Sequence, residues 1–160
     1  MSLHVRAATP ADLDRLIQLT LLAFEPVFAS FAHILGPHIY PIVYPDWKKS
    51  QRDWVEKICK SEKIEVWVAA LDDVVAGLVA YELNEKEKTG EIQFLAVHPA
   101  YQNNGVGTLL NEFALAKMRA AGMLLAVVGT GGDDSHTAAR RSYEKAGYTA
   151  LPLVRYYRAL

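Results

Sequence analysis

The residues best suited to chemistry lie between Glu91 and Gly122, in the stretch EIQFLAVHPAYQNNGVGTLLNEFALAKMRAAG. Its first part, residues 92–97, is apolar, short and partly β-branched, which predicts a strand. Pro99 ends this strand because proline has no amide hydrogen to give to a neighbouring strand. A polar turn follows at residues 102–108. The residues after it have the apolar period of a helix, which Gly122 ends.

A strand, a glycine turn and a helix in this order can bind a phosphate. The first backbone amides of a helix have no partner within the helix, and the helix dipole places partial positive charge there. Gly105 and Gly107 have no Cβ, so an anion can approach the backbone closely. On the glycines alone, an ordinary strand-to-helix turn is an equally good interpretation.

Two common phosphate-binding patterns are excluded. A P-loop requires a lysine after its last glycine, and Thr108 stands there. A dinucleotide fingerprint requires a small residue where Leu110 stands, and an acidic residue at the end of the next strand. That predicted strand, residues 123–128, ends at Gly129 without one.

The pattern that fits is Q-x-x-G-x-G, from Gln102 to Gly107, after a strand that ends in LAVHP. It resembles motif A of the GNAT superfamily of acyl-CoA-dependent N-acyltransferases, [RQ]-x-x-G-x-[GA]. The segment SHTAARRSYEKAGY, residues 135–148, resembles motif B of the same family. His136 departs from that motif, which usually has asparagine at this position.

The resemblance implies acetyl-CoA as cosubstrate and assigns residues to hold it. Backbone amides of the motif A turn would bind the pyrophosphate: Gln102, Asn103, Asn104, Gly105, Val106, Gly107 and Thr108. The backbone of the preceding strand, Leu95, Ala96 and Val97, would pair with the pantetheine arm, and the amide near Val97 could point at the thioester oxygen. His136 is counted with these cofactor-side residues, in a structural rather than a catalytic role. No metal is expected.

Tyr143 and Glu91 are the candidate catalytic residues. Tyr143 occupies the motif B tyrosine and would protonate the leaving thiolate, since a phenol with a pKa of about 10 stays protonated at neutral pH. The alternative is an inward-facing packing residue. Glu91 would be the general base, and strand alternation predicts it on the same face as Leu95 and Val97. An exposed carboxylate without a role is an equal alternative, and Glu82 or a chain of water molecules could replace it as base.

Composition narrows the classes of function. With 51% hydrophobic and 22% charged residues, the 160-residue chain is expected to form one globular domain, residues 1–160. Its net charge of −1 comes without a basic patch, so nucleic acid is not an expected partner. Cys59 is the only cysteine, which excludes an internal disulfide. The sequence shows neither the layout of a signal peptide nor an 18-residue apolar run, so we expect no membrane contact and a cytoplasmic location.

The predicted elements give an α/β fold, with a mixed, mostly antiparallel sheet flanked by helices. Residues 3–8, 63–71, 74–83, 91–97, 123–129 and 151–159 are predicted strands. Asp72-Asp73 is expected to join the second and third as a hairpin, and the fifth is expected to be buried, as a parallel strand would be. Helices are expected at residues 9–24, 46–60, 106–121 and 135–146, with Asp134 or Ser135 capping the last. The family resemblance adds a V-shaped opening between the two central strands.

Two connecting segments carry further expectations. Residues 25–50 are predicted to be irregular because four prolines interrupt them. By the family resemblance their aromatic residues would shape the acceptor site, and the alternative is that they pack the first two helices together. Residues 129–134 are predicted to be a flexible loop, and Arg140 and Arg141 are expected to be solvated.

The sequence therefore predicts an N-acetyltransferase that moves an acetyl group from acetyl-CoA to a primary amine of a small molecule or peptide, in a direct ternary complex. Cys59 lies away from both motifs, which disfavours an acyl-cysteine intermediate. A non-catalytic acyl-CoA-binding regulatory module and a nucleotide-binding domain stay open as alternatives. Whether the chain forms a homodimer also stays open.

Overall fold

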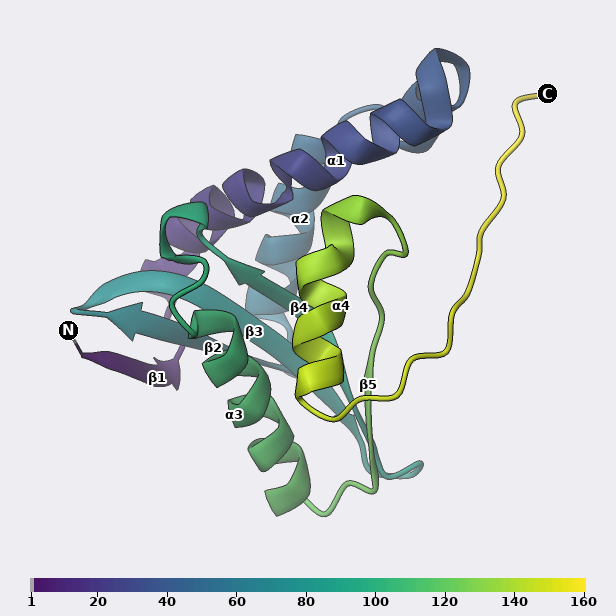
Figure 1. The fold of residues 1–160 in the computed structure, drawn as a ribbon. Helices are drawn as coiled ribbons and strands as arrows, with labels where there is room; N and C mark the ends of the chain where they lie inside the picture. The colour runs from purple at the N-terminus through teal and green to yellow at the C-terminus, as the bar shows by residue number, and fades with distance from the viewer. Residues whose placement is uncertain (1) are drawn as a thin grey trace.

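The computed structural model describes residues 2–160 and contains one five-stranded sheet in the order β1-β2-β3-β4-β5 (Figure 1). The strands are β1 (Leu3–Ala7), β2 (Ile64–Leu71), β3 (Val74–Asn84), β4 (Thr89–Val97) and β5 (Leu125–Val128). The α-helices are α1 (Leu13–Val43), α2 (Trp47–Lys60), α3 (Val106–Ala120) and α4 (Thr137–Lys145). Three short 3₁₀ helices, η1 (Pro10–Asp12), η2 (Pro99–Tyr101) and η3 (Asp134–His136), precede α1, α3 and α4.

The sheet is mixed, as predicted. β1 to β4 pair antiparallel in sequence order, and β5 joins β4 in parallel. Asp72 and Asp73 form the turn between β2 and β3 with φ values of 47° and 68°. Positive φ at both central residues is the geometry that suits a two-residue hairpin, so the hairpin prediction is confirmed.

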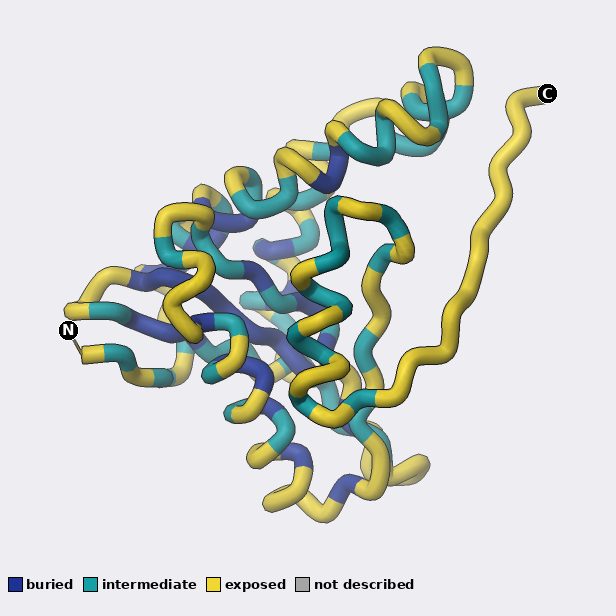
Figure 2. Tube along the Cα trace, in the orientation of Figure 1, coloured by how far each residue is buried: buried dark blue, intermediate teal, exposed yellow. Residues whose placement is uncertain are grey.

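The helices cover both faces of the sheet. Leu16 and Leu19 of α1 and Ile58 of α2 are fully buried on one face. On the other face α3 buries Leu110 and Ala114. Figure 2 shows the buried residues concentrated in the central strands between these two layers. Gly77 in β3 lets α3 approach closely, because a Cβ there would meet Leu110 Cδ1 at 3.1 Å.

The prediction of an irregular segment over residues 25–50 is wrong, because α1 continues to Val43. Pro26 lies inside the helix, and Gly36, with φ 76° and ψ 175°, separates it into two segments. Pro37 then takes the first position of the second segment, where its missing amide costs nothing. Aromatic packing outweighs the unfavourable proline positions: Phe28 stacks on Trp47 at 4.5 Å and Phe31 on Tyr44 at 5.5 Å.

The stretch from Pro10 to Val43 is also long and apolar enough to meet the length and composition criteria for a membrane-spanning helix, contrary to the expectation from sequence. Its buried residues pack on the sheet, where Phe24 stacks on Phe94 with ring centroids 5.2 Å apart. The buried residues of α1 lie between Leu16 and Phe28, and only 22% of its most apolar 18-residue window is buried.

Two predictions near the C-terminus are wrong. The strand expected to be buried at residues 123–129 is limited to β5, which lies at the edge of the sheet and exposes Leu125 and Val127. Residues 151–159 form no strand in the structure and are exposed. Continuous apolar character suggested a strand with a neighbour on each side, but within residues 2–160 β5 pairs only with β4.

An ion pair fixes β1 to the start of α1. Arg6 Nη1 and Nη2 donate to the Asp12 carboxylate at 2.8 and 2.9 Å, and the Thr9 amide donates to Asp12 Oδ2 at 2.8 Å. The hydrogen bond from Arg6 is the main reason that the pKa of Asp12 falls to about 2. The Asp12 carboxylate, at the end of η1, therefore binds both Arg6 of β1 and the Thr9 amide that precedes η1.

We predict that Asp12→Asn lowers the free energy of unfolding at pH 7 by about 1 kcal/mol, a modest value because the Arg6 side chain is 38% exposed. The folded pKa lies below the unfolded value of about 3.9, so this stability is present above pH 4 and lost as the pH falls toward 2. Urea unfolding between pH 7 and pH 2 should show a shallower acid decline for the variant. Asp53→Asn, which breaks the exposed pair of Lys49 and Asp53, is the control and should change little. An unchanged acid decline in Asp12→Asn would contradict the assignment.

Candidate active site

β4 and β5 separate partway along the sheet. Their parallel pairing runs from Thr89 and Leu125 to Ile92 and Val128 and then stops, while β4 continues to Val97. Residues 93–97 therefore have no partner on the β5 side. Leu95, Ala96 and Val97, predicted to hold the pantetheine arm, lie on this open edge. The V-shaped opening expected from the family resemblance is present in the sheet.

A β-bulge lies at the point of separation. Ala80 pairs with Phe94 and Tyr81 pairs with Ile92, so Gln93 is the extra residue on β4. Such a bulge bends the strand and strengthens its twist, which accounts for the departure of β4 from β5.

The bulge also reverses the two faces of β4. Ile92, Leu95 and Val97 pack on the α3 side of the sheet, whereas Phe94 and Ala96 pack on the α1 and α2 side. Glu91 precedes the bulge and points away from the side of its neighbour Ile92, so it shares the α1 and α2 side. The prediction that alternation places Glu91 with Leu95 and Val97 is therefore wrong, because the extra residue breaks the period of two.

Glu91 and Glu82 stand directly opposite each other on β4 and β3. Side chains at such positions have Cβ atoms about 4.5–5.5 Å apart. Glu91 is exposed and Glu82 is half-buried. The two carboxylates together form a negative site one residue before the separation point, and such a pair attracts a cationic group.

The glycine turn is attached to the end of β4. Gln102 Nε2 donates to the Val97 carbonyl at 3.2 Å, and the Ala100 amide donates to His98 Nδ1 at 3.1 Å. Asn103 and Gly105 have φ values of 63° and 79°. These left-handed residues turn the chain from η2, which follows β4, into α3.

The N-terminus of α3 is uncapped. Its N-cap is Gly105, which offers no side chain, and the first turn has no acidic residue. The amides of Val106, Gly107 and Thr108 have no acceptor inside the helix. A Cβ built at Gly105 would meet nothing within 4 Å, so the approach is open. These free amides and the helix dipole fit a pyrophosphate, as the motif predicts.

Tyr143 lies on α4 and packs edge-on against Tyr148, with ring centroids 5.7 Å apart. Burial, with a smaller contribution from Tyr148, raises the pKa of Tyr143 to about 12. This is above the ordinary value of about 10 expected from sequence. The phenol thus stays protonated over a wide pH range. It is a much weaker acid than a thiol, so it suits hydrogen-bond donation to a thiolate better than complete proton transfer.

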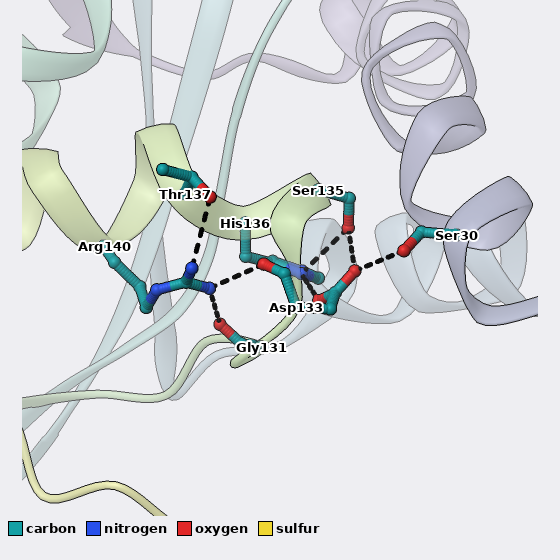
Figure 3. Close-up of polar contacts among 7 residues, drawn as sticks. All are labelled: Ser30, Gly131, Asp133, Ser135, His136, Thr137 and Arg140. Carbon is teal, nitrogen blue, oxygen red and sulfur yellow. Dashed lines mark hydrogen bonds and ion pairs between the residues drawn. The ribbon is translucent and has the colours of Figure 1, made fainter. Parts of the chain in front are cut away.

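A partly buried carboxylate, Asp133, which was not among the predicted site residues, joins α1 to the start of α4 (Figure 3). Asp133 accepts hydrogen bonds from Ser30 Oγ at 2.6 Å and Ser135 Oγ at 2.5 Å, and its other oxygen lies 2.6 Å from His136 Nδ1. Burial alone would raise the pKa of Asp133, but these hydrogen bonds outweigh it and hold the pKa well below its usual range. The signal in the sequence is an acid three residues before His136.

His136 is held in place by this network. Besides Asp133, it contacts Phe31 of α1, with ring centroids 5.8 Å apart. Its contact with the cofactor stays a prediction. The helix α4 begins at Thr137 with His136 as its N-cap residue, so the predicted caps Asp134 and Ser135 are wrong.

Arg140 is not a solvated charge, contrary to prediction. Its Nη1 donates to the carbonyls of Gly131 and Asp133, each at 2.7 Å, and its Nη2 donates to Thr137 Oγ1 at 3.2 Å. The loop at residues 129–134, predicted to be flexible, is therefore tied to α4. Figure 3 shows the Arg140 side chain turned back along the helix toward this loop.

The aromatic residues of α1 and α2 form one packed cluster. Phe28 contacts Phe31, Tyr44 and Trp47. These contacts support the interpretation that the aromatic residues pack the first two helices together. Phe31 extends the cluster to His136, so the segment also borders the loop before α4.

Comparison of the chain with known proteins identifies its family. The acetyltransferase (GNAT) family matches residues 30–148, which is well over half of the chain. A mycothiol acetyltransferase from Streptosporangium roseum is 42% identical over 63 residues, 39% of this chain and 18% of that protein. The match thus spans less than a fifth of the length of that curated relative.

Solved structures share the fold. The PaiA N-acetyltransferase from Thermoplasma acidophilum, in complex with coenzyme A, has a TM-score of 0.72 at 20% identity, covering 93% of this chain and 91% of that one. The ribosomal-protein-S18-alanine N-acetyltransferase from Escherichia coli has a TM-score of 0.69 at 14% identity, with coverage of 94% and 80%. AAC(6′)-Iy, in complex with the bisubstrate analogue CoA-S-monomethyl-acetylneamine, has a TM-score of 0.68 at 13% identity, with coverage of 100% and 99%.

The separated strands, the glycine turn at an uncapped helix and the match over both motifs lead to one conclusion: the chain belongs to the GNAT family of acetyltransferases.

Proposed function

We propose that this protein transfers an acetyl group from acetyl-CoA to a primary amine of a small molecule or peptide, by direct attack in a ternary complex. The observation that carries the proposal is the open edge of β4, residues 93–97, which leads through η2 and the glycine turn to the uncapped N-terminus of α3. One end of this path offers free strand edge and the other offers free amides. An extended arm that ends in a pyrophosphate has the matching chemistry.

The residues of the chain would divide the binding of acetyl-CoA between them. The amides from Gln102 to Thr108 would hold the pyrophosphate, and the backbone of Leu95 to Val97 would pair with the pantetheine arm. The cosubstrate supplies an acetyl group activated as a thioester. Coenzyme A in the PaiA structure and the CoA analogue in the AAC(6′)-Iy structure support this assignment.

The chemistry requires the amine nitrogen to form a bond to the carbonyl carbon while the carbon–sulfur bond breaks. Glu91 would take the proton from the amine, and the amide near Val97 would donate to the oxygen that becomes negative. Tyr143 would donate a hydrogen bond to the departing thiolate. Cys59 takes no part, since it lies in α2, where burial raises the pKa of its thiol.

The carboxylate pair suggests how the acceptor is recognised. A primary amine is mostly protonated at neutral pH, and Glu82 and Glu91 would attract that cation to the separation point. One carboxylate would then receive the proton that the amine must lose before attack. The amine-derived analogue in the AAC(6′)-Iy structure supports an amine acceptor of this kind.

Gly105→Asp should abolish most of the coenzyme A affinity, because it places a negative charge at the anion site. Isothermal titration calorimetry with coenzyme A measures this directly. Gly122→Asp is the matched control: Gly122 has a φ of 78°, close to the 79° of Gly105, and equally open surroundings, but it lies at the opposite end of α3. Equal losses in both variants would mean that backbone strain, and not the anion site, is responsible.

Glu91→Gln should lower kcat by about 10²–10⁴-fold at neutral pH, the usual range for general-base assistance, and higher pH should restore part of the rate. Release of free thiol from acetyl-CoA across a panel of amines gives the rate. Glu65→Gln, which changes an exposed carboxylate on β2, is the control and should be neutral. Turnover close to that of the unmodified protein would remove Glu91 from the mechanism. No thiol release with any amine would favour the non-catalytic acyl-CoA-binding module.

Tyr143→Phe should lower kcat with little change in coenzyme A affinity, since the hydroxyl acts only on the leaving thiolate. Because the pKa of Tyr143 is raised to about 12, the rate ratio of the two proteins should stay constant from pH 7 to pH 10. Tyr148→Phe removes the hydroxyl from the neighbouring ring and serves as the packing control. A ratio that falls as the pH approaches 10 would show that the phenol titrates at its ordinary value.

A further inference from the structure

We propose that His136 takes part in the reaction as a proton acceptor, and that Asp133 is the residue that positions it. In this arrangement Asp133 keeps the hydrogen of the imidazole ring on Nδ1, and the lone pair of Nε2 receives a proton from the acceptor nitrogen. The inference rests on the proposed function, which it deepens by naming a second proton acceptor besides Glu91. It replaces the structural role that the sequence suggested for His136.

The contact with Asp133 fixes which ring nitrogen of His136 carries the hydrogen. His136 Nδ1 lies 2.6 Å from Asp133 Oδ1. Burial alone would raise the pKa of Asp133, but its hydrogen bonds hold that pKa well below the usual range. The carboxylate is therefore ionised and can only accept hydrogen bonds. Nδ1 of the neutral ring must donate to it, so the lone pair is on Nε2.

Nε2 is the ring nitrogen that stays available. Within residues 2–160 both hydrogen bonds of the ring involve Nδ1, and the side chain is 15% exposed. Arg140, one turn further along α4, points elsewhere, because its guanidinium donates to the carbonyls of Gly131 and Asp133 and to Thr137 Oγ1. A neutral imidazole with a carboxylate at Nδ1 and a free Nε2 has the arrangement of a general base.

Two contacts of α1 place this ring near the open edge of β4. Phe24 stacks on Phe94 of the open segment, with ring centroids 5.2 Å apart, and Phe31 stacks on His136, with centroids 5.8 Å apart. Phe24 and Phe31 are seven residues apart, close to two helical turns, so they lie on one face of α1 about 10 Å from each other. α1 thus reaches from the open edge to the start of α4, as Figure 1 shows.

His136 also lies on the same side of α4 as Tyr143, since the two are again seven residues apart. Burial raises the pKa of Tyr143 to about 12, so the phenol stabilises a thiolate by hydrogen bonding but is too weak an acid to give it a proton. An imidazolium is a much stronger acid than a phenol. Once protonated, His136 can supply the proton that Tyr143 cannot.

The protons balance when the two acceptors act in turn. An amine that arrives as an ammonium ion must lose two protons to become an amide nitrogen. Glu91 takes the first, and the freed lone pair forms the carbon–nitrogen bond while the carbonyl electron pair moves to oxygen. His136 Nε2 takes the second proton from the newly bonded nitrogen, and Asp133 stabilises the imidazolium. The carbonyl then re-forms as the carbon–sulfur bond breaks with its electron pair on sulfur. His136 returns its proton to that thiolate, and Glu91 releases its own to water.

Kinetics test the role of Nε2. His136→Gln should lower kcat by about 10²-fold, within the usual range for acid–base assistance, while the coenzyme A affinity measured by calorimetry stays unchanged. Free imidazole should restore part of the rate that His136→Ala loses, because it can occupy the space left by the ring. His33→Gln changes an exposed histidine of α1 and is the control that should be neutral. Turnover of His136→Gln equal to that of the unmodified protein, or no recovery with imidazole, would overturn the inference.

Nuclear magnetic resonance tests the position of the ring hydrogen without any acceptor. In the isotopically labelled full chain at mildly basic pH, the ring nitrogens of His136, assigned by their loss in His136→Gln, should show hydrogen on Nδ1. In Asp133→Asn the carbonyl oxygen should stay with the hydroxyls of Ser30 and Ser135, which both donate to Oδ2. The new amide group then donates to Nδ1, so the hydrogen should move to Nε2 and kcat should fall as in His136→Gln.

The outcomes separate this inference from the proposed function. Hydrogen on Nε2 of His136 in the unmodified protein would overturn the inference and leave the proposed function intact. The same holds for an Asp133→Asn protein that keeps full turnover after the hydrogen has moved. If the unmodified protein releases no thiol with any amine, the proposed function fails, and the catalytic role of His136 fails with it even where the hydrogen is on Nδ1.

Discussion

The parallel pairing of β4 and β5 stops at Ile92 and Val128, and the arrangement of the site depends on that limit. Beyond this point β4 has no strand partner on the β5 side, which is unusual for a central strand because buried amides and carbonyls need partners. The bulge at Gln93 enforces the limit by turning β4 away from β5. The open edge then leads into α3, whose first amides are also free. A single extended ligand could satisfy both sets of groups.

Charge is separated across this opening. The N-terminus of α3 is positive because of its dipole and has no acidic residue to neutralise it. Glu82 and Glu91 make the other side of the opening negative. A chain with a net charge of only −1 thus offers separate sites for an anion and a cation. This polarity would suit the anionic acyl donor and the cationic amine of the proposed reaction.

α1 and α4 are connected by partly buried polar contacts. Asp133 binds Ser30 of α1 and His136 at the start of α4, and Arg140 fixes the loop between them. A carboxylate that accepts several hydrogen bonds in a buried position is costly to disrupt. α1 and the helix that carries Tyr143 are therefore held in one geometry.

Local patterns in the sequence were sufficient for much of the fold. The strand, glycine turn and helix around Gly105, the hairpin at Asp72 and Asp73, and the parallel β5 were predicted because each depends on neighbouring residues or on the order of elements. The same local patterns identified the turn of the candidate anion site and the helix that carries Tyr143. Free amides at a helix start follow from backbone geometry, which the sequence specifies through its glycines.

Other features depended on contacts between distant residues. The face on which Glu91 lies was predicted wrongly because one extra residue, Gln93, shifts the register against β3, and periodicity cannot reveal a bulge. The helix persists through Pro26 because Phe28, Phe31 and Trp47 pack together. The role of Asp133 depends on its hydrogen bond from Ser30, which lies 103 residues away in the sequence. The sequence alone determined the local turns and the elements with strong periodicity, because their energies come from neighbouring residues. Tertiary structure decided the strand register, the face of the sheet on which each side chain lies, and the pairing of strands. The interactions that determine these features join residues that come together only on folding.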